Sequence, residues 1–331
     1  MEYKIEKYND EVVFINVKNG NGLEVTLCNF GASTYNLLLN KKPIILSIED
    51  KEYFLNSPNF YGKTLGRVAG RVLCDQDIDG VKYHLDETLG GYSLHGGNEK
   101  SLSFKAWNYV IKEFKNRLDV IFTIKCKNKE NGFLGSLNLK VIYEVYANKN
   151  DFKIIFKGST PNASLLNLSN HIYWNFNLSK NVNDYTLKVN SEKYGVIDTT
   201  TFIRDTDKLP WYLDFNRATK LNPRLDYLEK KTWLKTIDNT FIFTDILKNK
   251  PQCILKNEDV RLSLYTDYPA MNIFVDNFRV PIKFVGIKNI EEPRRAIALE
   301  PQLYNYDIDS LKLRKGDKYS HFILYKFKEL K

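Results

Sequence analysis

Hydrophobic and polar residues alternate along most of the chain. In the segment 23–28 apolar residues occupy every second position, directly after an Asn-Gly-Asn-Gly turn sequence, and the same period recurs in residues 118–124 and 137–145. Successive side chains of a β-strand point to opposite faces of its sheet, so this period is typical of a strand with one face buried. The pattern predicts a chain built mainly from antiparallel strands.

Turn sequences join these segments into hairpins. Residues 148–151 (Asn-Lys-Asn-Asp) separate two alternating segments, and Asp79-Gly80 marks a second tight turn. Asn, Asp and Gly favour such turns because they tolerate the backbone angles that a tight reversal requires. Further strands are expected at residues 185–190, 260–265, 271–274, 296–300 and 321–327. A short helix is expected at residues 225–234 and at no other place.

Aromatic composition agrees with a strand-rich fold. The sequence contains 21 Tyr and 20 Phe, and aromatic residues pack well on the pleated surface of a sheet. We therefore expect an all-β fold, a large sandwich of long antiparallel sheets. No Gly/Ser run, Pro run or internal repeat interrupts the 331 residues, so residues 1–331 are expected to form a single domain.

Several features bear on where the protein works. Residues 1–7 mix both charges and no apolar run follows them, which argues against a signal peptide. No segment is apolar over the length needed to cross a bilayer. The four cysteines lie far apart and form no C-x-x-C pair, so reduced thiols are expected. These features predict a cytoplasmic protein with no membrane partner.

Charge and motif spacing exclude several classes of function. The formal charge is +9, but the lysines are interleaved with 40 acidic residues, and no recognition helix or aromatic RNA-binding signature accompanies them, so no nucleic-acid partner is expected. The four histidines have no metal-ligand spacing. Nucleotide-binding glycine motifs and the Gly-x-Ser-x-Gly motif of serine hydrolases are absent. We expect no cofactor and no metal, and only a metal site assembled from distant strands stays open.

The segment 167–178 carries the densest group of chemically useful residues. It places His171 among four asparagines and three aromatic residues. Aromatic faces suit a sugar ring, amides can bind hydroxyl groups, and an imidazole can transfer a proton near neutral pH. A buried histidine satisfied by its neighbours is the structural alternative.

Two glycine-rich stretches offer further candidates. Arg67 and Arg71 lie four residues apart between small residues; on a strand they would share a face, and both could point into one cleft. Two arginines on the surface are the alternative. His95 directly precedes two glycines, which would let a loop present the imidazole at a defined angle, although a plain turn has the same sequence.

Two acidic residues lie where strands begin or end. Asp238 stands between apolar residues at the start of a strand, where an aspartate can also serve to form a turn. Glu300 ends an apolar strand, so burial would raise its pKa and make it a better base near neutral pH. A buried structural glutamate would need a partner, and none is obvious in the neighbouring sequence.

Seven short motifs occur in the order and rough spacing of one known family. They occupy residues 29–32, 66–71, 93–97, 170–175, 238–241, 269–272 and 299–302. Over this region the chain resembles the aldose 1-epimerases, also called galactose mutarotases. The resemblance implies a large β-sandwich of the galactose-mutarotase type with the site in a cleft on one sheet. It also implies an isomerase that interconverts the α and β anomers of a free hexose such as galactose or glucose, without a cofactor.

The resemblance also implies a role for each candidate. Glu300 looks like the general base and His171 like the general acid, and a nearby Glu300 carboxylate would keep His171 partly protonated. The residues that would hold the sugar are Arg71, His95, Asp238 and Asn272, the last at a position where many members carry glutamine.

Some positions differ from the common pattern of the family. Gly70 stands where asparagine is frequent, Ala270 replaces a usual glycine, and residues 304–307 lack the usual Pro-Asp. These positions border the substrate, so the preferred sugar stays open. The alternatives are an epimerase acting on a hexose 6-phosphate or on maltose, and a non-catalytic sugar-binding protein on the same scaffold. A sugar is the expected partner, and the expected oligomeric state is monomer or homodimer.

Overall fold

The structure of the protein, a computed structural model, describes residues 1–88, 90–97, 99–200, 202–246, 249–279, 281–286 and 293–330. Strands dominate this part of the chain, and the long neighbouring strands pair antiparallel. The expected all-β fold is therefore confirmed, and each strand expected from the sequence is present within a few residues of its predicted bounds.

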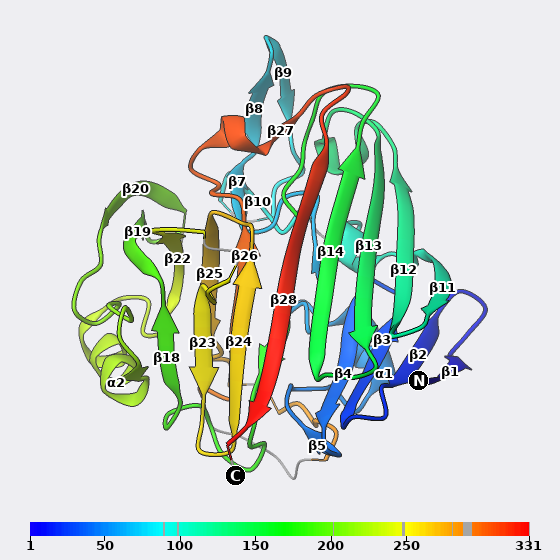
Figure 1. Ribbon diagram of the computed structural model, residues 1–331. Coiled ribbons are helices and arrows are strands. Elements are labelled where there is room, and N and C mark those ends of the chain that lie inside the picture. Colours follow the sequence, from blue (N-terminus) through cyan, green and yellow to red (C-terminus); the bar gives the residue numbers. More distant parts are fainter. Residues whose placement is uncertain are drawn as a thin grey trace.

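A nine-stranded sheet forms one layer (Figure 1). In spatial order its strands are β11 (Asn108–Phe114), β12 (Arg117–Cys126), β13 (Leu137–Tyr146), β14 (Asp151–Ser159), β28 (Tyr319–Glu329), β24 (Val260–Thr266), β23 (Cys253–Lys256), β18 (Thr186–Val189) and β21 (Thr219–Lys220). The strand at its centre comes from the end of the sequence, because β28 pairs with β14 on one side and with β24 on the other.

A six-stranded sheet lies behind it and carries most of the residues considered below. Its order is β17 (Tyr173–Trp174), β26 (Ile297–Gln302), β25 (Ala270–Val275), β22 (Asp238–Phe243), β19 (Ser191–Ile197) and β20 (Ile203–Lys208).

The first part of the chain adds a five-stranded sheet and several short strand pairs. The sheet contains β1 (Glu2–Lys7), β2 (Val13–Lys18), β3 (Leu23–Cys28), β4 (Ser33–Leu39) and β5 (Lys42–Pro43). The short pairs are β7 (Arg71–Leu73) with β10 (Tyr92–Leu94), β8 (Asp75–Ile78) with β9 (Val81–His84), β6 (Thr64–Leu65) with β16 (Ser169–Asn170), and β15 (Ser164–Leu165) with β27 (Lys312–Leu313).

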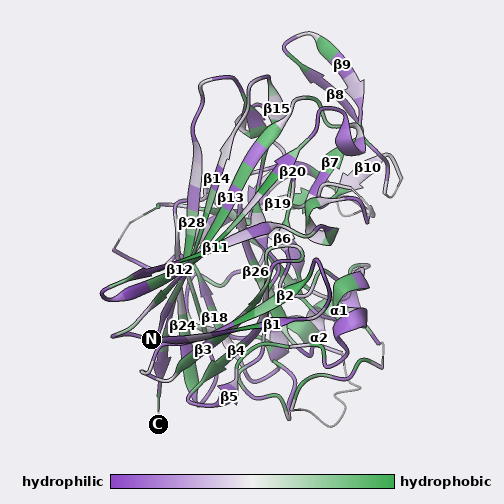
Figure 2. Cartoon of the chain, turned by 90° about the vertical axis from the view of Figure 1, so that its right-hand side faces the viewer, coloured by the Kyte–Doolittle hydropathy of each residue, from purple (hydrophilic) through white to green (hydrophobic). Residues whose placement is uncertain are grey.

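Sequence alternation sets the two faces of these sheets. In β13 the residues at 137, 139, 141, 143 and 145 are buried, whereas Asn138 and Lys140 between them are exposed. The same alternation appears as neighbouring green and purple residues along the strands in Figure 2. The predicted turn at Asp79-Gly80 joins β8 to β9, and both residues have positive φ (54° and 85°), as a tight hairpin turn requires. This hairpin extends beyond the sheets in both views.

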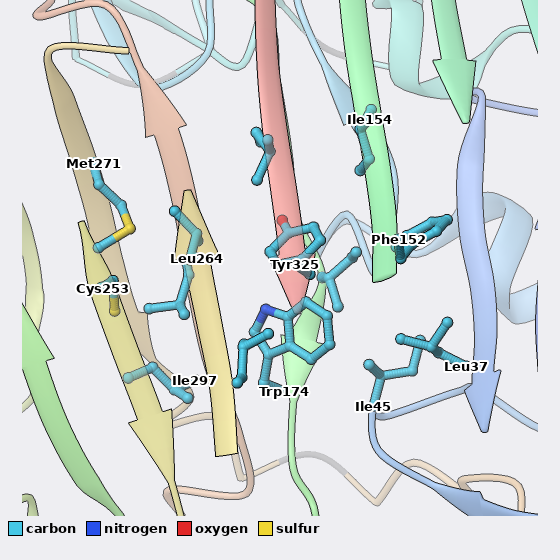
Figure 3. Close-up of a cluster of buried hydrophobic side chains, with 14 of the residues drawn as sticks. Leu37, Ile45, Phe152, Ile154, Trp174, Cys253, Leu264, Met271, Ile297 and Tyr325 are labelled. Atoms are coloured by element: carbon cyan, nitrogen blue, oxygen red, sulfur yellow. The ribbon is translucent and has the colours of Figure 1, made fainter. Parts of the chain in front are cut away.

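The main hydrophobic core lies between the nine-stranded and six-stranded sheets. Figure 3 shows Cys253, Leu264 and Tyr325 of the first sheet facing Met271 and Ile297 of the second. Trp174 of β17 packs against the ring of Tyr325, with the ring centroids 4.8 Å apart. Because apolar residues alternate with the other positions of each strand, the opposite face of the six-stranded sheet is left to carry polar side chains.

Helices are few, and their prediction was partly wrong. The expected helix is α2 (Asn222–Lys231), which begins three residues early because Pro223 suits the first turn of a helix. A second helix, α1 (Lys51–Asn56), was not predicted. It is only six residues long, too short to show a helical period, and it begins where the Asp50 side chain accepts hydrogen bonds from the backbone N–H groups of Glu52 and Tyr53. Short 3₁₀ turns occur at Leu102–Phe104, Glu130–Gly132 and Ile308–Leu311.

In the described part of the chain, no helix has the length and apolar character needed to span a membrane.

Candidate active site

A cavity of about 300 Å³ opens on the face of the six-stranded sheet that points away from the main core. All six residues proposed from the sequence line this cavity: Arg71, His95, His171, Asp238, Asn272 and Glu300. They come from segments far apart in the chain, so the fold, rather than local sequence, brings them together.

Strand register builds one wall of the cavity. Glu300 of β26 lies directly opposite Asn272 of β25, which in turn lies opposite Thr240 of β22. Asp238 lies two residues before Thr240 in β22, so the two side chains are on the same face of the sheet. Residues on the other face of β25 and β26 belong to the hydrophobic core, so the period of two aims the polar set at the cavity.

Asn272 braces Asp238. Its Nδ2 donates a hydrogen bond to Asp238 Oδ1 at 3.0 Å, and its Oδ1 accepts one from Thr240 Oγ1 at 3.3 Å. The amide predicted to reach a sugar is thus engaged on both sides within the wall, and it orients a carboxylate that remains half-buried.

Backbone hydrogen bonds fix His171 between β16 and β17. Its N–H donates to the carbonyl of Lys63 at 3.0 Å, and its carbonyl accepts from the N–H of Gly62 at 2.9 Å. The ring is thereby held with Nε2 3.5 Å from Glu300 Oε1. The two side chains expected to act as acid and base therefore face each other, and His171 and Glu300 are 5% and 1% exposed.

His95 is held by two hydrogen bonds to one residue. Its backbone N–H donates to the carbonyl of Gly70 at 2.9 Å, and its Nδ1 accepts from the N–H of Gly70 at 3.1 Å. Because Nδ1 accepts, the neutral ring carries its proton on Nε2 and acts there as a donor. The following glycine is needed for close packing, since a Cβ at Gly96 would lie 1.9 Å from the carbonyl oxygen of Gly66.

The two arginines of the 66–72 stretch have separate roles, contrary to the expectation that both enter one cleft. Arg67 is 3% exposed, and its guanidinium donates to the carbonyls of Lys127, Leu134 and Gly135 away from the cavity. The residues between the arginines do not form a regular strand, and Gly70 turns the chain with a φ of 74°. Arg71 alone of the pair lines the cavity.

Aromatic rings lie around His171 and Glu300. Phe60 packs beside both histidines, with its ring centroid 4.9 Å from that of His95 and 6.4 Å from that of His171. Tyr173 packs on the other side of His171 at 4.7 Å. Of the aromatic residues of segment 167–178, which were expected to suit a sugar, Tyr173 lines the cavity and Trp174 packs in the core. Phe60 was missed, because its neighbouring sequence carries no motif.

Gln302 and Asn305 also line the cavity and were missed. A signal existed for Gln302, because it follows Glu300 by two residues and β26 extends two residues beyond its predicted end. The period of two then places both side chains on one face.

Burial controls the protonation of the pair. It raises the pKa of Glu300 to about 8, with the charge of Asp238 as a smaller contribution in the same direction. It also lowers the pKa of His171 to about 4. Near neutral pH the pair therefore holds one proton, and in this structure that proton rests on Glu300. The expectation that His171 is partly protonated is not met there, because desolvation of the imidazolium outweighs the attraction of the carboxylate.

The pKa of His95 is held well below its usual value by burial first and then by the proximity of His171 and Arg71. His95 is consequently a neutral donor at physiological pH.

Three of these side chains have the residue types of a metal site. Within the described residues, one ligand atom from each of His95, His171 and Glu300 lies within 4.8 Å of the others. A histidine binds a metal through an unprotonated nitrogen. Nδ1 of His95 accepts a hydrogen bond from the Gly70 N–H, so Nε2 of His95 carries the ring proton. Neither nitrogen of His95 is then free to bind a metal ion. The donor set fits hydrogen bonding to a hydroxylated ligand better than coordination of a metal ion.

Comparison with known proteins gives a consistent result. The sequence pattern of the family described as Aldose 1-epimerase matches residues 14–326. The bifunctional protein gal10 of Schizosaccharomyces pombe is 26% identical over 329 residues, covering 92% of this chain and 44% of that protein. The aldose 1-epimerase of Streptococcus thermophilus is 25% identical over 227 residues, covering 65% of this chain and 64% of that protein. The matched region thus spans less than two thirds of either relative.

A solved structure supports the fold. The galactose 1-epimerase of Lactobacillus acidophilus superposes with a TM-score of 0.86 at 22% identity, covering 99% of this chain and 98% of that one. The predicted sandwich of the galactose-mutarotase type is confirmed by this similarity.

Replacing Glu300 by glutamine should change how stability depends on pH. Burial raises the pKa of Glu300 from 4.5 to about 8, so between these values the folded protein keeps a proton that the unfolded chain has released. The contribution of Glu300 to the free energy of unfolding therefore falls as pH rises through this window. Glutamine cannot ionise, so the stability of Glu300→Gln relative to wild type should rise with pH, by at most about 1.4 kcal/mol per unit.

Urea unfolding of both proteins at several pH values between about 5 and 8 measures this difference. The same substitution at an exposed glutamate, Glu113→Gln, is the matched control. A difference between Glu300→Gln and wild type that stays constant across the range would mean that Glu300 is not buried as an acid.

Proposed function

Because the chain belongs to the aldose 1-epimerase family, we propose that it is an isomerase that interconverts the α and β anomers of a free hexose such as galactose or glucose. The observation that carries this proposal is the contact of His171 Nε2 with Glu300 Oε1 at 3.5 Å inside a buried cavity. Opening a pyranose ring requires a proton to leave O1 while another reaches the ring oxygen O5. A base and an acid on facing walls suit this exchange.

In the proposed reaction Glu300 and His171 exchange the roles of base and acid between ring opening and ring closure. With the proton on His171, Glu300 accepts the proton of O1 while His171 donates to O5, and the C1–O5 bond breaks to give the open-chain aldehyde. After rotation about C1–C2, Glu300 returns its proton to O1 and His171 takes the proton of O5 as O5 attacks the other face of C1. Each partner contributes about two to four powers of ten in rate.

The protonation of the pair fits this cycle. The cycle requires one proton shared by the two side chains. While the open-chain sugar is bound, that proton is on Glu300 and His171 is neutral. The two groups are 3.5 Å apart, so a small approach on entry of the cyclic sugar would let the proton pass to His171.

Three side chains would hold the ring while C1 turns. Arg71 and His95 supply N–H donors, and the Asp238 carboxylate supplies acceptors, oriented by its bond from Asn272. A hydroxyl needs both kinds of partner. Fixing the remote hydroxyl groups keeps C1 and O5 near the pair and lowers the entropic part of the barrier.

The charges lining the cavity favour a neutral sugar over a hexose 6-phosphate. Among the described lining residues Arg71 is the single lysine or arginine, and the acidic side chains of Asp238 and Glu300 line the same cavity. A phosphate normally requires more positive charge than this. The volume of about 300 Å³ lies at the small end for ligand pockets, which favours one sugar ring over maltose.

A non-catalytic sugar-binding protein is the second candidate. Aromatic rings and Arg71 would suffice for binding, but such a protein has no need of a buried acid facing a buried base. The cost of burying both groups favours the catalytic function. Polarimetry of freshly dissolved α-D-galactose and α-D-glucose with the purified protein distinguishes the two, since a binding protein leaves the spontaneous rate unchanged.

Glu300→Gln and His171→Asn should each lower kcat by about two to four powers of ten, because each removes one partner of the proton exchange. Polarimetric rates corrected for uncatalysed mutarotation measure the effect. Glu113→Gln and His84→Asn, both at exposed positions, serve as controls and should keep the wild-type rate. Near-normal rates in either active-site variant would refute the assignment of acid and base.

Arg71→Ala should mainly weaken substrate binding. Its guanidinium has no hydrogen-bond or ion-pair partner among the described residues, so its donors are available to the sugar. Loss of a charge-assisted hydrogen bond should raise KM about 10- to 100-fold, with a smaller change in kcat. Arg314→Ala, which breaks an exposed ion pair with Asp79, is the control. An unchanged KM in Arg71→Ala would exclude this role.

A further inference from the structure

The cavity contains an amide whose position suggests a role in sugar specificity. Gln302 is 2% exposed, lines the cavity, and follows Glu300 by two residues on the same face of β26. In the described part of the chain, its buried Oε1 has no hydrogen-bond partner. A buried polar group without a partner is costly, and beside a ligand cavity the simplest explanation is that the ligand supplies the partner.

Gly70 brings this amide close to the sugar-holding residues. A Cβ built at Gly70 would lie 3.3 Å from Gln302 Nε2 and 3.6 Å from its Oε1. The nearest atom is Nδ2 of Asn305 at 2.7 Å, so the amides of Asn305 and Gln302 both lie against Gly70. The same Gly70 holds His95 through its N–H, and Arg71 is the next residue.

Arg71 and His95 offer only hydrogen-bond donors to the cavity. The guanidinium of Arg71 can only donate, and the tautomer of His95 makes its Nε2 a donor as well. Both can bind the oxygen of a hydroxyl, but neither can accept its hydrogen. A hydroxyl held there needs an acceptor from another residue.

Two neighbouring amides are already engaged. Asn305 donates to the carbonyls of Ala69 and Arg71 and accepts from Asn167. Asn272 bonds Asp238 and Thr240, as described above. Within the described residues Oε1 of Gln302 accepts no hydrogen bond, so rotation about the terminal bond of this side chain can turn the oxygen toward the ligand.

We propose that Gln302 accepts the hydrogen of a sugar hydroxyl whose oxygen is bound by Arg71 and His95, and that this contact helps select the hexose. The inference rests on the proposed function, because it concerns a subsite of the same cavity. It makes Gln302 a specificity-determining residue that acts remote from the reacting bond.

Pairing one substitution with altered sugars tests the contact directly. Gln302→Met keeps the length of the side chain and removes its acceptor, and Gln302→Glu keeps an acceptor oxygen. Both variants and the wild type are assayed by polarimetry on the better hexose and on its 2-, 3-, 4- and 6-deoxy analogues, each corrected for the spontaneous rate. Gln76→Leu, a glutamine outside the cavity, is the control and should match wild type.

In the wild type, removal of this hydroxyl should lower kcat/KM by more than about tenfold, because Arg71 and His95 lose their contacts together with Gln302. In Gln302→Met this penalty should be about three- to tenfold smaller, the share of one neutral hydrogen bond. Gln302→Glu should keep the full penalty, and the effects of the other deoxy positions should be unchanged. A structural role for Gln302 would instead lower activity on every sugar by the same factor.

Two outcomes with an active wild type overturn the inference. In the first, the loss of kcat/KM caused by Gln302→Met multiplies independently with the loss caused by each deoxy position. In the second, Gln302→Met matches wild type on all sugars. Should Gln302→Met fail to fold, loss of the penalty in Gln302→Glu would overturn it equally. A wild type inactive on every sugar contradicts the proposed function itself, and the inference with it.

Discussion

A carboxyl group and an imidazole buried 3.5 Å apart set the conditions that the rest of the site must meet. Burial favours the neutral form of each, so it raises the pKa of Glu300 and lowers that of His171. Over the neutral range the pair then keeps one proton that either group can carry. A reaction that removes one proton from the substrate while returning another needs this balance, and a solvated pair would lack it, because water stabilises the charged forms.

Two independent constraints hold the pair at this distance. Glu300 is positioned by the register of β26 with β25, which a one-residue shift would turn toward the core. His171 is positioned by backbone hydrogen bonds to Gly62 and Lys63. Lys63 is itself fully buried: its ammonium donates to the carbonyl of Leu55 at 2.6 Å and lies 3.9 Å from the centre of the Phe104 ring. The segment that orients the imidazole is thus tied to α1 and to an aromatic cluster, which limits its movement.

Much of the fold and the membership of the site could be predicted from the sequence, and the reasons for the failures are physical. Period-two alternation located the strands because one face of each sheet is buried. It missed α1, which is defined by the capping of Asp50 rather than by a pattern. The motifs gave the six cavity residues, but they could not separate Arg67 from Arg71, since a turn at Gly70 aims the two side chains apart. Phe60 and the proton on Nε2 of His95 depend on contacts between distant segments, which no local pattern encodes.

The pH dependence of kcat/KM for the wild type between about pH 4 and pH 10 tests the shared-proton pair most directly, because it reports the ionisations of the free enzyme. The structure predicts a bell-shaped profile whose acid limb reflects a pKa of about 4 and whose alkaline limb reflects one of about 8, with activity confined to the state that holds one proton. A profile that is flat across this range, or that has a single limb at the ordinary pKa of histidine, would contradict the account.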